Sequence, residues 1–445
     1  YWRVINKYPN LQGGFIWDFA DQGLRKAIPS ERVRHGGPAT YWAYGGDFGD
    51  YPNDDNFCCN GLVQPDRRPS PQMQEVRYCY QPMSVEALDA ARGRFRIRNE
   101  AFFTNLRAYE CRWTYEENGR AIAKGSLGRL DVPPRAEKDV SIPLSMVRRP
   151  VHAALVSAWN FTFATVRATP WADAGFVVGH SQAVVPADSP PAALPHVIGP
   201  GVQTRAEETE EAVVVTGADF AARVCKRSGA LVSWKVKGAE QLLAPLEPDF
   251  WRAPTDNDRG NGMAARHAVW RRAAERREVK GVGVRREADG SCLVEARLVF
   301  PEAGETSGTL AYAFSNAGHI RVTLRVKPAG EGLPSLPRVG LTLQLPAAYD
   351  RVTWLGRGPH ENYADRRASA FFGEYTLAAE DFFFPYVEPQ ETGNRTDTFW
   401  VTFTDRDGRG VHIRGDPKIN FSVLPYTTEE LQARKHPWEL NPCGN

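Results

Sequence analysis

Apolar and polar residues alternate with a period of two through most of the chain beyond residue 83. Phe95 and Ile97 stand between arginines at positions 94, 96 and 98, and the same alternation runs through residues 232–236 and 320–327. A period of two places successive side chains on opposite faces of a strand, so these segments predict strands with one buried face. The Asn118-Gly119 pair, which follows an aromatic strand, predicts a tight hairpin turn.

Two β-domains follow from this pattern. Residues 83–185 predict a small immunoglobulin-like β-sandwich, with a further strand at 151–161. Residues 196–445 have longer strands and predict a large antiparallel β-sandwich with one wet face. The four prolines of residues 186–195 exclude a helix or a central strand and predict a linker. One helix with a solvated face is predicted at 263–279, where Ala, Arg and Glu dominate.

Residues 1–82 differ from the rest of the chain in their pattern of apolar and polar residues. An apolar run at 13–18 opens into the polar side chains of Asp18 and Asp21. A short apolar strand that opens into a polar loop is typical of an α/β-barrel strand near its catalytic end. A long Gly-rich loop with aromatic side chains follows at 44–53, and such loops in compact domains are usually functional. The stretch therefore predicts the C-terminal part of a (β/α)8 barrel in a chain that is mainly β.

Net charge and cysteine content exclude several classes of partner. The 445 residues carry 55 basic and 53 acidic side chains, a formal charge of +2. This near-balance predicts no nucleic-acid partner and no attraction to an anionic membrane. No segment approaches the roughly 20 apolar residues of a membrane span, and no signal peptide is visible. The seven cysteines are sparse and lack zinc spacing, which favours reduced thiols in a cytoplasmic protein.

Both ends of the chain look like cuts in a longer protein. The chain starts at Tyr1, a strand-like run follows almost at once, and the first methionine is Met73. The last residues, 442–445, come directly after a structured-looking stretch. We therefore expect further sequence beyond both ends.

Aromatic side chains beside carboxylates and amides are the features that point to chemistry, because Walker-type, G-x-S-x-G and H-E-x-x-H motifs are absent. Trp17 can offer a flat apolar face to a sugar ring, and neighbouring carboxylates and amides can bind its hydroxyls. The oxygen-rich residues 53–61 can bind a hard cation or sugar hydroxyls. Structural alternatives stay open for each: a core tryptophan, a loop of Asx turns, and a buried ion pair at Glu361. Residues 251–258 indicate a structural corner, and the Gly-containing residues 386–396 a mobile loop.

Six motifs follow one another between residues 11 and 396. They are LQGGFIWDFADQGL, YGGDFGDYPNDDNFCCNGLV, PDRRPSP, WRAPTDND, GRGPHENYADR and YVEPQETGNRT. Together they resemble the large bacterial lactose-hydrolysing β-galactosidases of glycoside hydrolase family 2. The last three motifs belong to a large C-terminal sandwich that the shorter glucuronidases of this family lack.

The resemblance implies an enzyme of five domains that hydrolyses terminal β-galactosyl bonds with retention. This chain would hold the last part of the central barrel, the fourth domain and most of the fifth. Retention needs two carboxyl groups about 5–5.5 Å apart. In the family both are glutamates on earlier barrel strands, which implies that no catalytic residue lies in this chain and that it is inactive alone. The implied partners are a β-galactoside, the N-terminal domains and further copies of the full enzyme.

The resemblance also implies roles for individual residues. Trp17 matches a tryptophan that walls the galactose site, and Asn60 matches an asparagine that contacts the sugar and a sodium ion. Phe57 matches a phenylalanine whose backbone carbonyl binds that sodium and whose ring shifts when ligand binds. A magnesium site is implied mostly outside this chain. Residues 388–397 match a mobile gating loop, and its candidate residues are Glu388, Gln390, Glu391, Gly393 and Asn394.

One position departs from the family, and other functions stay open. Asp55 stands where the best-known relative has an arginine that contacts the gating loop, so gating is expected to differ. The alternatives are a non-catalytic small subunit, a carbohydrate-binding scaffold, and a family 2 enzyme for another sugar. If the chain alone were active, a new carboxylate pair would be sought among Asp18, Asp21 and Glu361.

Overall fold

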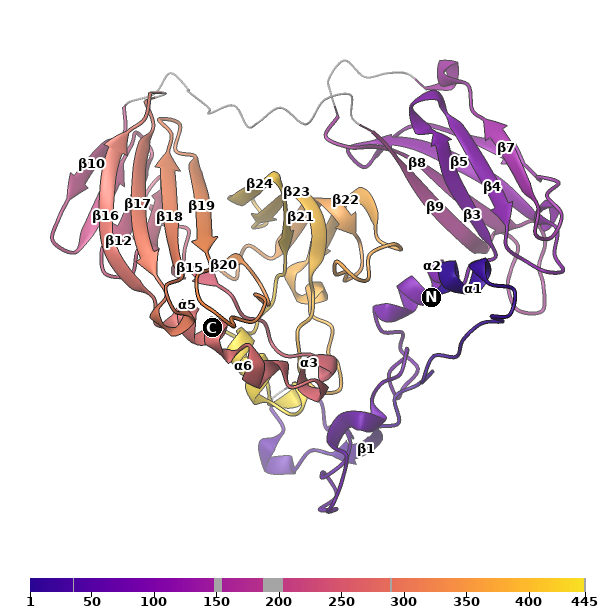
Figure 1. Cartoon of the computed structure of the whole chain (residues 1–445), viewed down its shortest axis with the longest axis horizontal. Coiled ribbons are helices and arrows are strands. Elements are labelled where there is room, and N and C mark those ends of the chain that lie inside the picture. The colour runs from indigo at the N-terminus through magenta and orange to yellow at the C-terminus, as the bar shows by residue number, and fades with distance from the viewer. Residues whose placement is uncertain (35, 148–153, 187–202, 289, 444–445) are drawn as a thin grey trace.

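The computed structural model describes residues 1–34, 36–147, 154–186, 203–288 and 290–443. In the view of Figure 1, two groups of strands stand apart, β3–β9 on one side and β10–β20 on the other, with β21–β24 between them. Residues 1–82 run beneath these sheets. The predicted linker lies outside the described residues apart from Pro186. No helix in the described ranges is long and apolar enough to cross a membrane.

Residues 1–82 contain short elements joined by long loops. They are α1 (Trp2–Lys7), β1 (Leu24–Ala27), β2 (Thr40–Ala43), a 3-10 turn at Asp55–Cys58 and α2 (Gln72–Cys79). The predicted strand at 13–18 was wrong, because this run forms no regular element and leaves Phe15 and Trp17 exposed. A barrel strand is held by hydrogen bonds to neighbouring strands, and the described residues place no strand beside this run.

The first sandwich is built from two antiparallel sheets. One has the order β3 (Met83–Asp89), β4 (Arg94–Asn99), β7 (Glu137–Ser141), and the other β6 (Arg120–Gly128), β5 (Tyr109–Glu117), β8 (Ser157–Thr165), β9 (Val177–Val185). Phe95 and Ile97 are fully buried, which confirms the alternation. Their neighbours in the core include Trp113, Trp159 and Phe161. The strand expected at 151–161 begins at Ser157, and residues 151–153 lie outside the described part.

The predicted hairpin turn joins β5 to β6 and reaches the C-terminal strands. Asn118 and Gly119 both have positive φ, 47° and 76°, as such a tight turn requires. A Cβ on Gly119 would overlap the backbone nitrogen of Glu374, so only glycine fits there. Next to the turn, the Gln182 side chain exchanges two hydrogen bonds of 2.8 and 2.9 Å with the backbone of Phe372. The small sandwich is thereby fixed against β22.

The C-terminal region begins with a second, larger sandwich. Its first sheet has the order β10 (Arg205–Glu208), β11 (Ala212–Thr216), β12 (Phe220–Cys225), β13 (Leu231–Val236), β15 (Ala244–Asp249), β20 (Gly340–Gln344), with β14 (Ala239–Glu240) beside β13. The second sheet has the order β16 (Glu278–Arg286), β17 (Cys292–Val299), β18 (Ser307–Phe314), β19 (Ile320–Lys327). Both sheets contribute to one core around Phe250, Tyr312 and Phe314. The strands predicted at 232–236 and 320–327 are confirmed.

A further sheet and the short helices complete this region. The sheet has the order β22 (Phe371–Ala378), β21 (Arg351–Gly358), β23 (Arg395–Thr404), β24 (Gly410–Phe421), and its core lies around Trp354. The helices are α3 (Asp256–Gly260), α4 (Met263–Arg266), α5 (Ala268–Glu275) and α6 (Thr428–Ala433). The single helix expected at 263–279 was wrong in extent. It breaks at His267 and ends at Glu275, because residues from Glu278 onwards pair with β17.

Residues 1–82 are held against the C-terminal region by polar contacts. On α2, the Glu75 carboxylate accepts hydrogen bonds from the backbone nitrogens of Ala368 and Ser369, at 3.0 and 2.9 Å. On the other side, Asp47 accepts a 3.0 Å hydrogen bond from His436, and the Tyr44 hydroxyl donates to the Lys435 carbonyl. These contacts place the barrel segment although it lacks a large core of its own.

We predict that residues 1–82 are the part of the chain that proteases cleave first. Their aromatic side chains are exposed and much of the segment is loop, so local opening costs little free energy. Limited proteolysis of the full chain, read by mass spectrometry, measures this. Cleavage of residues 203–443 at the same rate as residues 1–82 would contradict the prediction.

Candidate functional site

The Trp17 and Asn60 segments lie side by side although they are far apart in sequence. The Asp18 nitrogen donates to the Asn60 carbonyl at 3.4 Å, the Gln22 nitrogen donates to the Cys58 carbonyl at 2.8 Å, and Ala20 forms an isolated parallel bridge with Val63. These contacts bring the segments of three sequence-predicted residues, Trp17, Phe57 and Asn60, into one neighbourhood.

The three predicted sugar-contact residues are open to solvent. The exposed fraction is 79% for Trp17 and 70% for Phe57, and Asn60 is also exposed. The core-tryptophan alternative is therefore wrong for Trp17 in this chain. No side-chain hydrogen bond joins the Asn60 amide to another residue of the described ranges. An indole face and a free amide are available together, as recognition of a sugar ring requires.

Asp21 lies beneath these residues and holds the two segments together. Its carboxylate accepts a 2.7 Å hydrogen bond from the Gly61 nitrogen. A Cβ on Gly61 would overlap the backbone of Ala20 and Asp21, so glycine permits this close approach. Burial raises the pKa of Asp21 to about 6, the Gly61 hydrogen bond lowers it, and the charges of Asp18 and Asp256 raise it further.

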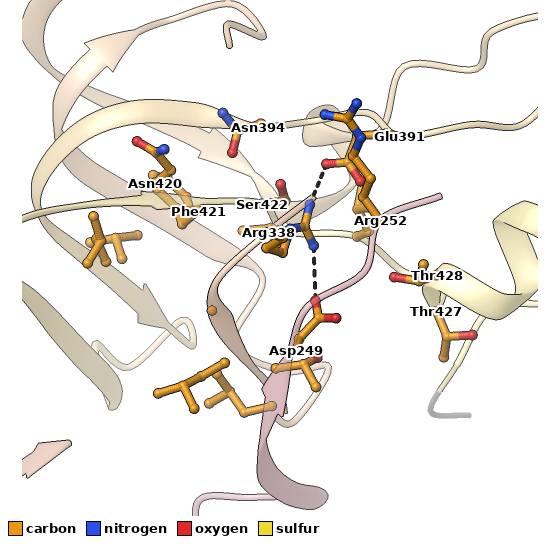
Figure 2. A pocket seen from close by; sticks show the side chains of 18 of the residues that line it. Asp249, Arg252, Arg338, Glu391, Asn394, Asn420, Phe421, Ser422, Thr427 and Thr428 are labelled. Atoms are coloured by element: carbon orange, nitrogen blue, oxygen red, sulfur yellow. Dashed lines mark hydrogen bonds and ion pairs between the residues drawn. The ribbon is translucent and has the colours of Figure 1, made fainter. Parts of the chain in front are cut away.

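A cleft of about 2730 Å³ extends from these residues into the C-terminal region. Asp21 and Asn60 line one end, and strands β19, β20 and β24 line the other. Figure 2 shows its inner wall, where Arg338 bridges Asp249 and Glu391 at 3.2 and 2.8 Å. The cleft thus joins Asn60, one of the predicted sugar-contact residues, to the predicted gating loop.

The outer half of the predicted gating loop is tied to α3. Glu388 forms an ion pair with Arg259. The Gln390 amide donates to the Asp256 carboxylate at 2.9 Å and accepts from the Asp256 nitrogen at 3.2 Å. Burial raises the pKa of Glu388 to about 7, while Arg259 lowers it and Asp256 raises it.

The inner half of the loop is buried and is held by hydrogen bonds and an ion pair. Glu391 pairs with Arg338, and the Asn394 amide donates to the Asn362 carbonyl at 2.7 Å. The Gly393 nitrogen donates to Glu361 at 2.7 Å. Gln390, Glu391 and Asn394 all have exposed fractions below 10%. Any movement of this loop would have to break these contacts, and gating stays a prediction.

The Glu361 carboxylate takes the structural role left open for it by the sequence. Its exposed fraction is 4%. One oxygen accepts from Arg366 at 2.6 Å and Tyr386 at 2.7 Å, and the other accepts from Thr392 at 2.8 Å and Gly393 at 2.7 Å. Four donors satisfy both oxygens, so this carboxylate anchors the loop and is not free to act on a substrate.

Asp256 is a site residue that the sequence analysis missed. Its carboxylate accepts a 2.6 Å hydrogen bond from the Asn56 amide, so it links the gating loop to the loop that carries Phe57 and Asn60. Asp55 stands where the best-known relative has an arginine that contacts the gating loop. The Asp55 carboxylate lies 3.8 Å from the Lys435 ammonium. Sequence analysis took residues 251–258 as a corner, and their run of acidic residues was the one available signal. The corner itself is present, since Thr255 caps α3 in a capping box with Asp258, which pairs with Arg252.

The donor chemistry at this end of the cleft fits a hard cation in part. The Phe57 carbonyl and the Asn60 amide oxygen are donors of the type that such ions prefer. Within the described ranges, no group of three or more His, Cys, Asp or Glu side chains is arranged to hold a metal. Sodium binding by the Phe57 carbonyl and the Asn60 amide oxygen therefore stays a prediction.

Three family models match the chain in sequence order. The glycosyl hydrolases family 2 TIM barrel domain matches residues 1–85, domain 4 of β-galactosidase matches residues 95–186, and the β-galactosidase small chain matches residues 216–445. These matches define part of a multidomain glycoside hydrolase of family 2. Because the last model alone covers more than half of the chain, the chain belongs to the β-galactosidase family.

Curated relatives extend the same similarity over the whole chain. The β-galactosidase of Priestia megaterium is 37% identical over 442 residues, which are 99% of this chain and 41% of the relative. The β-galactosidase of Halalkalibacterium halodurans is 32% identical over 99% of this chain and 42% of its own length. The corresponding values for Klebsiella pneumoniae strain 342 are 35%, 98% and 41%. The chain thus spans about two fifths of the length of the relatives it matches.

Replacement of Glu361 by Gln is expected to lower the free energy of unfolding by about 3 kcal/mol, because the Arg366 guanidinium loses its buried anion. Urea denaturation of the full chain, followed by tryptophan fluorescence, measures the change. The matched control is Glu302→Gln, an ion-paired glutamate that is more exposed, which should shift the midpoint little. Equal shifts for both variants would contradict the anchoring role.

The pairing of residues 17–22 with 58–63 is expected to weaken as pH rises from about 4 to about 6. In this window the unfolded chain releases the Asp21 proton before the folded chain does, so stability falls with pH, by about 1 kcal/mol because solvent screens this partly exposed carboxyl. Hydrogen exchange of the Val63 amide, corrected for intrinsic rates, reports the opening free energy. The Asp21→Asn variant should have a flat profile, and a wild-type profile that rises over this window would refute the prediction.

Proposed function

We propose that this chain forms part of a retaining β-galactosidase that hydrolyses terminal β-D-galactosyl residues of lactose-like substrates. In this proposal it supplies sugar-binding and gating residues and not the catalytic pair. The observation that carries the proposal is the backbone hydrogen bond that joins the Trp17 segment to Asn60, which lines the cleft. The names of the relatives support the reaction, since all three described above are β-galactosidases.

The side chains of this region bind and orient a sugar. The Trp17 indole packs against the apolar face of the galactosyl ring, and the Asn60 amide bonds a ring hydroxyl. Both exclude water from their side of the ring. The two carboxyl groups of a retaining mechanism come from sequence outside this chain. The Glu361 carboxylate supports this assignment, because its oxygens already accept four hydrogen bonds and leave it no role at a sugar.

The proposed cofactors are sodium and magnesium. Sodium would be held by the Phe57 carbonyl and the Asn60 amide oxygen, and when bound it supplies a fixed positive charge for sugar hydroxyls. Magnesium would be held mainly by residues outside the chain. The Asn56–Asp256 hydrogen bond would keep the sodium-binding loop in register with the gating loop.

The proposed partners are the N-terminal domains of the full enzyme. The greater length of the relatives supports this proposal, since the chain covers 41% of the β-galactosidase of Priestia megaterium. The full enzyme is proposed to be a cytoplasmic homo-oligomer. A second candidate role is that of a non-catalytic small subunit, which the small-chain family model favours for residues 216–445. The match of residues 1–85 to the TIM barrel domain of family 2 favours the first role, because it ties the chain to the catalytic domain of that family.

The decisive test is hydrolysis of a chromogenic β-galactoside by the chain alone, and then after mixing with the N-terminal portion of a relative that precedes the matched region. We expect no activity alone and activity on mixing. Activity of the chain alone would overturn the proposal, and cleavage of a β-glucuronide instead would assign another sugar.

Trp17→Ala and Asn60→Ala, tested in the mixed enzyme, are each expected to lower kcat/KM about tenfold or more, equivalent to roughly 1.4 kcal/mol. The matched control is Trp171→Ala, since Trp171 is also exposed but lies in the small sandwich. This variant should keep full activity. Equal losses for Trp17→Ala and Trp171→Ala would count against a sugar-binding role.

A further inference from the structure

Two cysteine sulfurs lie against each other beside the sugar-contact residues. Cys58 and Cys59 are adjacent in sequence, and their Sγ atoms are 3.8 Å apart. Both are free thiols and half-buried. A disulfide bond is about 2.0 Å long, so roughly 2 Å of side-chain movement separates contact from bond. Elsewhere in the described ranges no second pair of cysteines makes a sulfur–sulfur contact.

The backbone around the pair is held while the sulfurs stay accessible. The Cys58 carbonyl accepts from the Gln22 nitrogen, and the Cys59 nitrogen donates to the Asn56 carbonyl, both at 2.8 Å. Cys59 also lines the cleft, so a small oxidant can reach it from solvent. The two thiols are therefore presented together by a fixed turn, with Phe57 on one side and Asn60 on the other.

We propose that Cys58 and Cys59 are an oxidisable vicinal dithiol that closes to a disulfide, with a hydroperoxide such as hydrogen peroxide as the oxidant. One sulfur of the pair attacks a peroxide oxygen as its thiolate, the O–O bond breaks, and that cysteine becomes a sulfenic acid as water leaves. The other sulfur then attacks the sulfenic sulfur, an S–S bond forms, and a second water carries away the hydroxyl and the proton of the second thiol. Two thiols are oxidised and one peroxide is reduced to two waters.

Ring closure would also change the sugar site, a consequence that rests on the proposed function. A bond between neighbouring residues turns the backbone between them, and the flanking residues are Phe57 and Asn60. Oxidation should therefore move the sodium and sugar ligands of this loop and lower activity.

The first experiment treats the full chain with hydrogen peroxide, blocks free thiols with N-ethylmaleimide, and analyses tryptic peptides by mass spectrometry. Cleavage after Arg34 and Arg67 leaves both cysteines in one peptide, residues 35–67, which contains no other cysteine. We expect this peptide to carry no label and to weigh ~2 Da less than its reduced form. Two labels, a sulfinic acid, or a bond to another peptide would overturn the proposal.

Matched variants give the controls. Cys59→Ser should abolish the mass loss and leave Cys58 as a sulfenic or higher acid. Cys225→Ser removes a half-buried cysteine of the large sandwich and should leave the mass loss intact. Loss of the closed peptide in Cys225→Ser would contradict the assignment of the pair.

The second experiment measures kcat/KM of the mixed enzyme before oxidation, after it, and after dithiothreitol. We expect a several-fold fall that dithiothreitol reverses in the wild type and in Cys225→Ser. A closed disulfide with unchanged activity would refute the effect on the sugar site. Absence of activity in the reduced mixture would instead refute the proposed function and leave the mass result standing.

Discussion

The buried Glu361 carboxylate is the interaction on which the arrangement of the cleft depends. An ionised group out of water costs several kcal/mol unless its oxygens are bonded, so its four donors cannot separate cheaply. Two of those donors, Thr392 and Gly393, fix the loop at 388–397. Gln390 of that loop is hydrogen-bonded to Asp256, and Asp256 is hydrogen-bonded to Asn56. A chain of polar contacts thus runs from a deep anchor to the residues that face the sugar.

The sugar-facing segment takes its shape from other parts of the molecule more than from its own packing. Residues 1–82 contribute few buried apolar side chains, and the large hydrophobic cores lie beyond residue 83. Glu75 on one side and Asp47 on the other hold the segment to the C-terminal region. The sandwiches therefore act as a frame, and the frame orders loops that would otherwise be free.

Local patterns predicted the strands and the hairpin, because alternation and the Asn118-Gly119 turn act over a few residues. The strand at 13–18 and the helix end were predicted wrongly because their outcome depends on distant partners. Residues from Glu278 pair with β17 against their helical composition, and the barrel run finds no partner strand among the described residues. In the site, Trp17 and Asn60 came from a family resemblance, whereas the Asn56–Asp256 contact joins positions 200 apart and leaves no local signal.

The close fit of Gly119 against Glu374 prevents the β5–β6 turn from moving closer to β22. The tip of this turn touches the neighbouring sheet, which contains β22, and has no room for a longer loop or a side chain. The length of the turn is therefore set by the distance between the small sandwich and that sheet. The small sandwich cannot rotate relative to the sheet that contains β22 without losing this contact and the two hydrogen bonds of Gln182. The small sandwich is thus braced against the C-terminal region. This turn is therefore a poor place for insertions, although hairpin tips usually accept them.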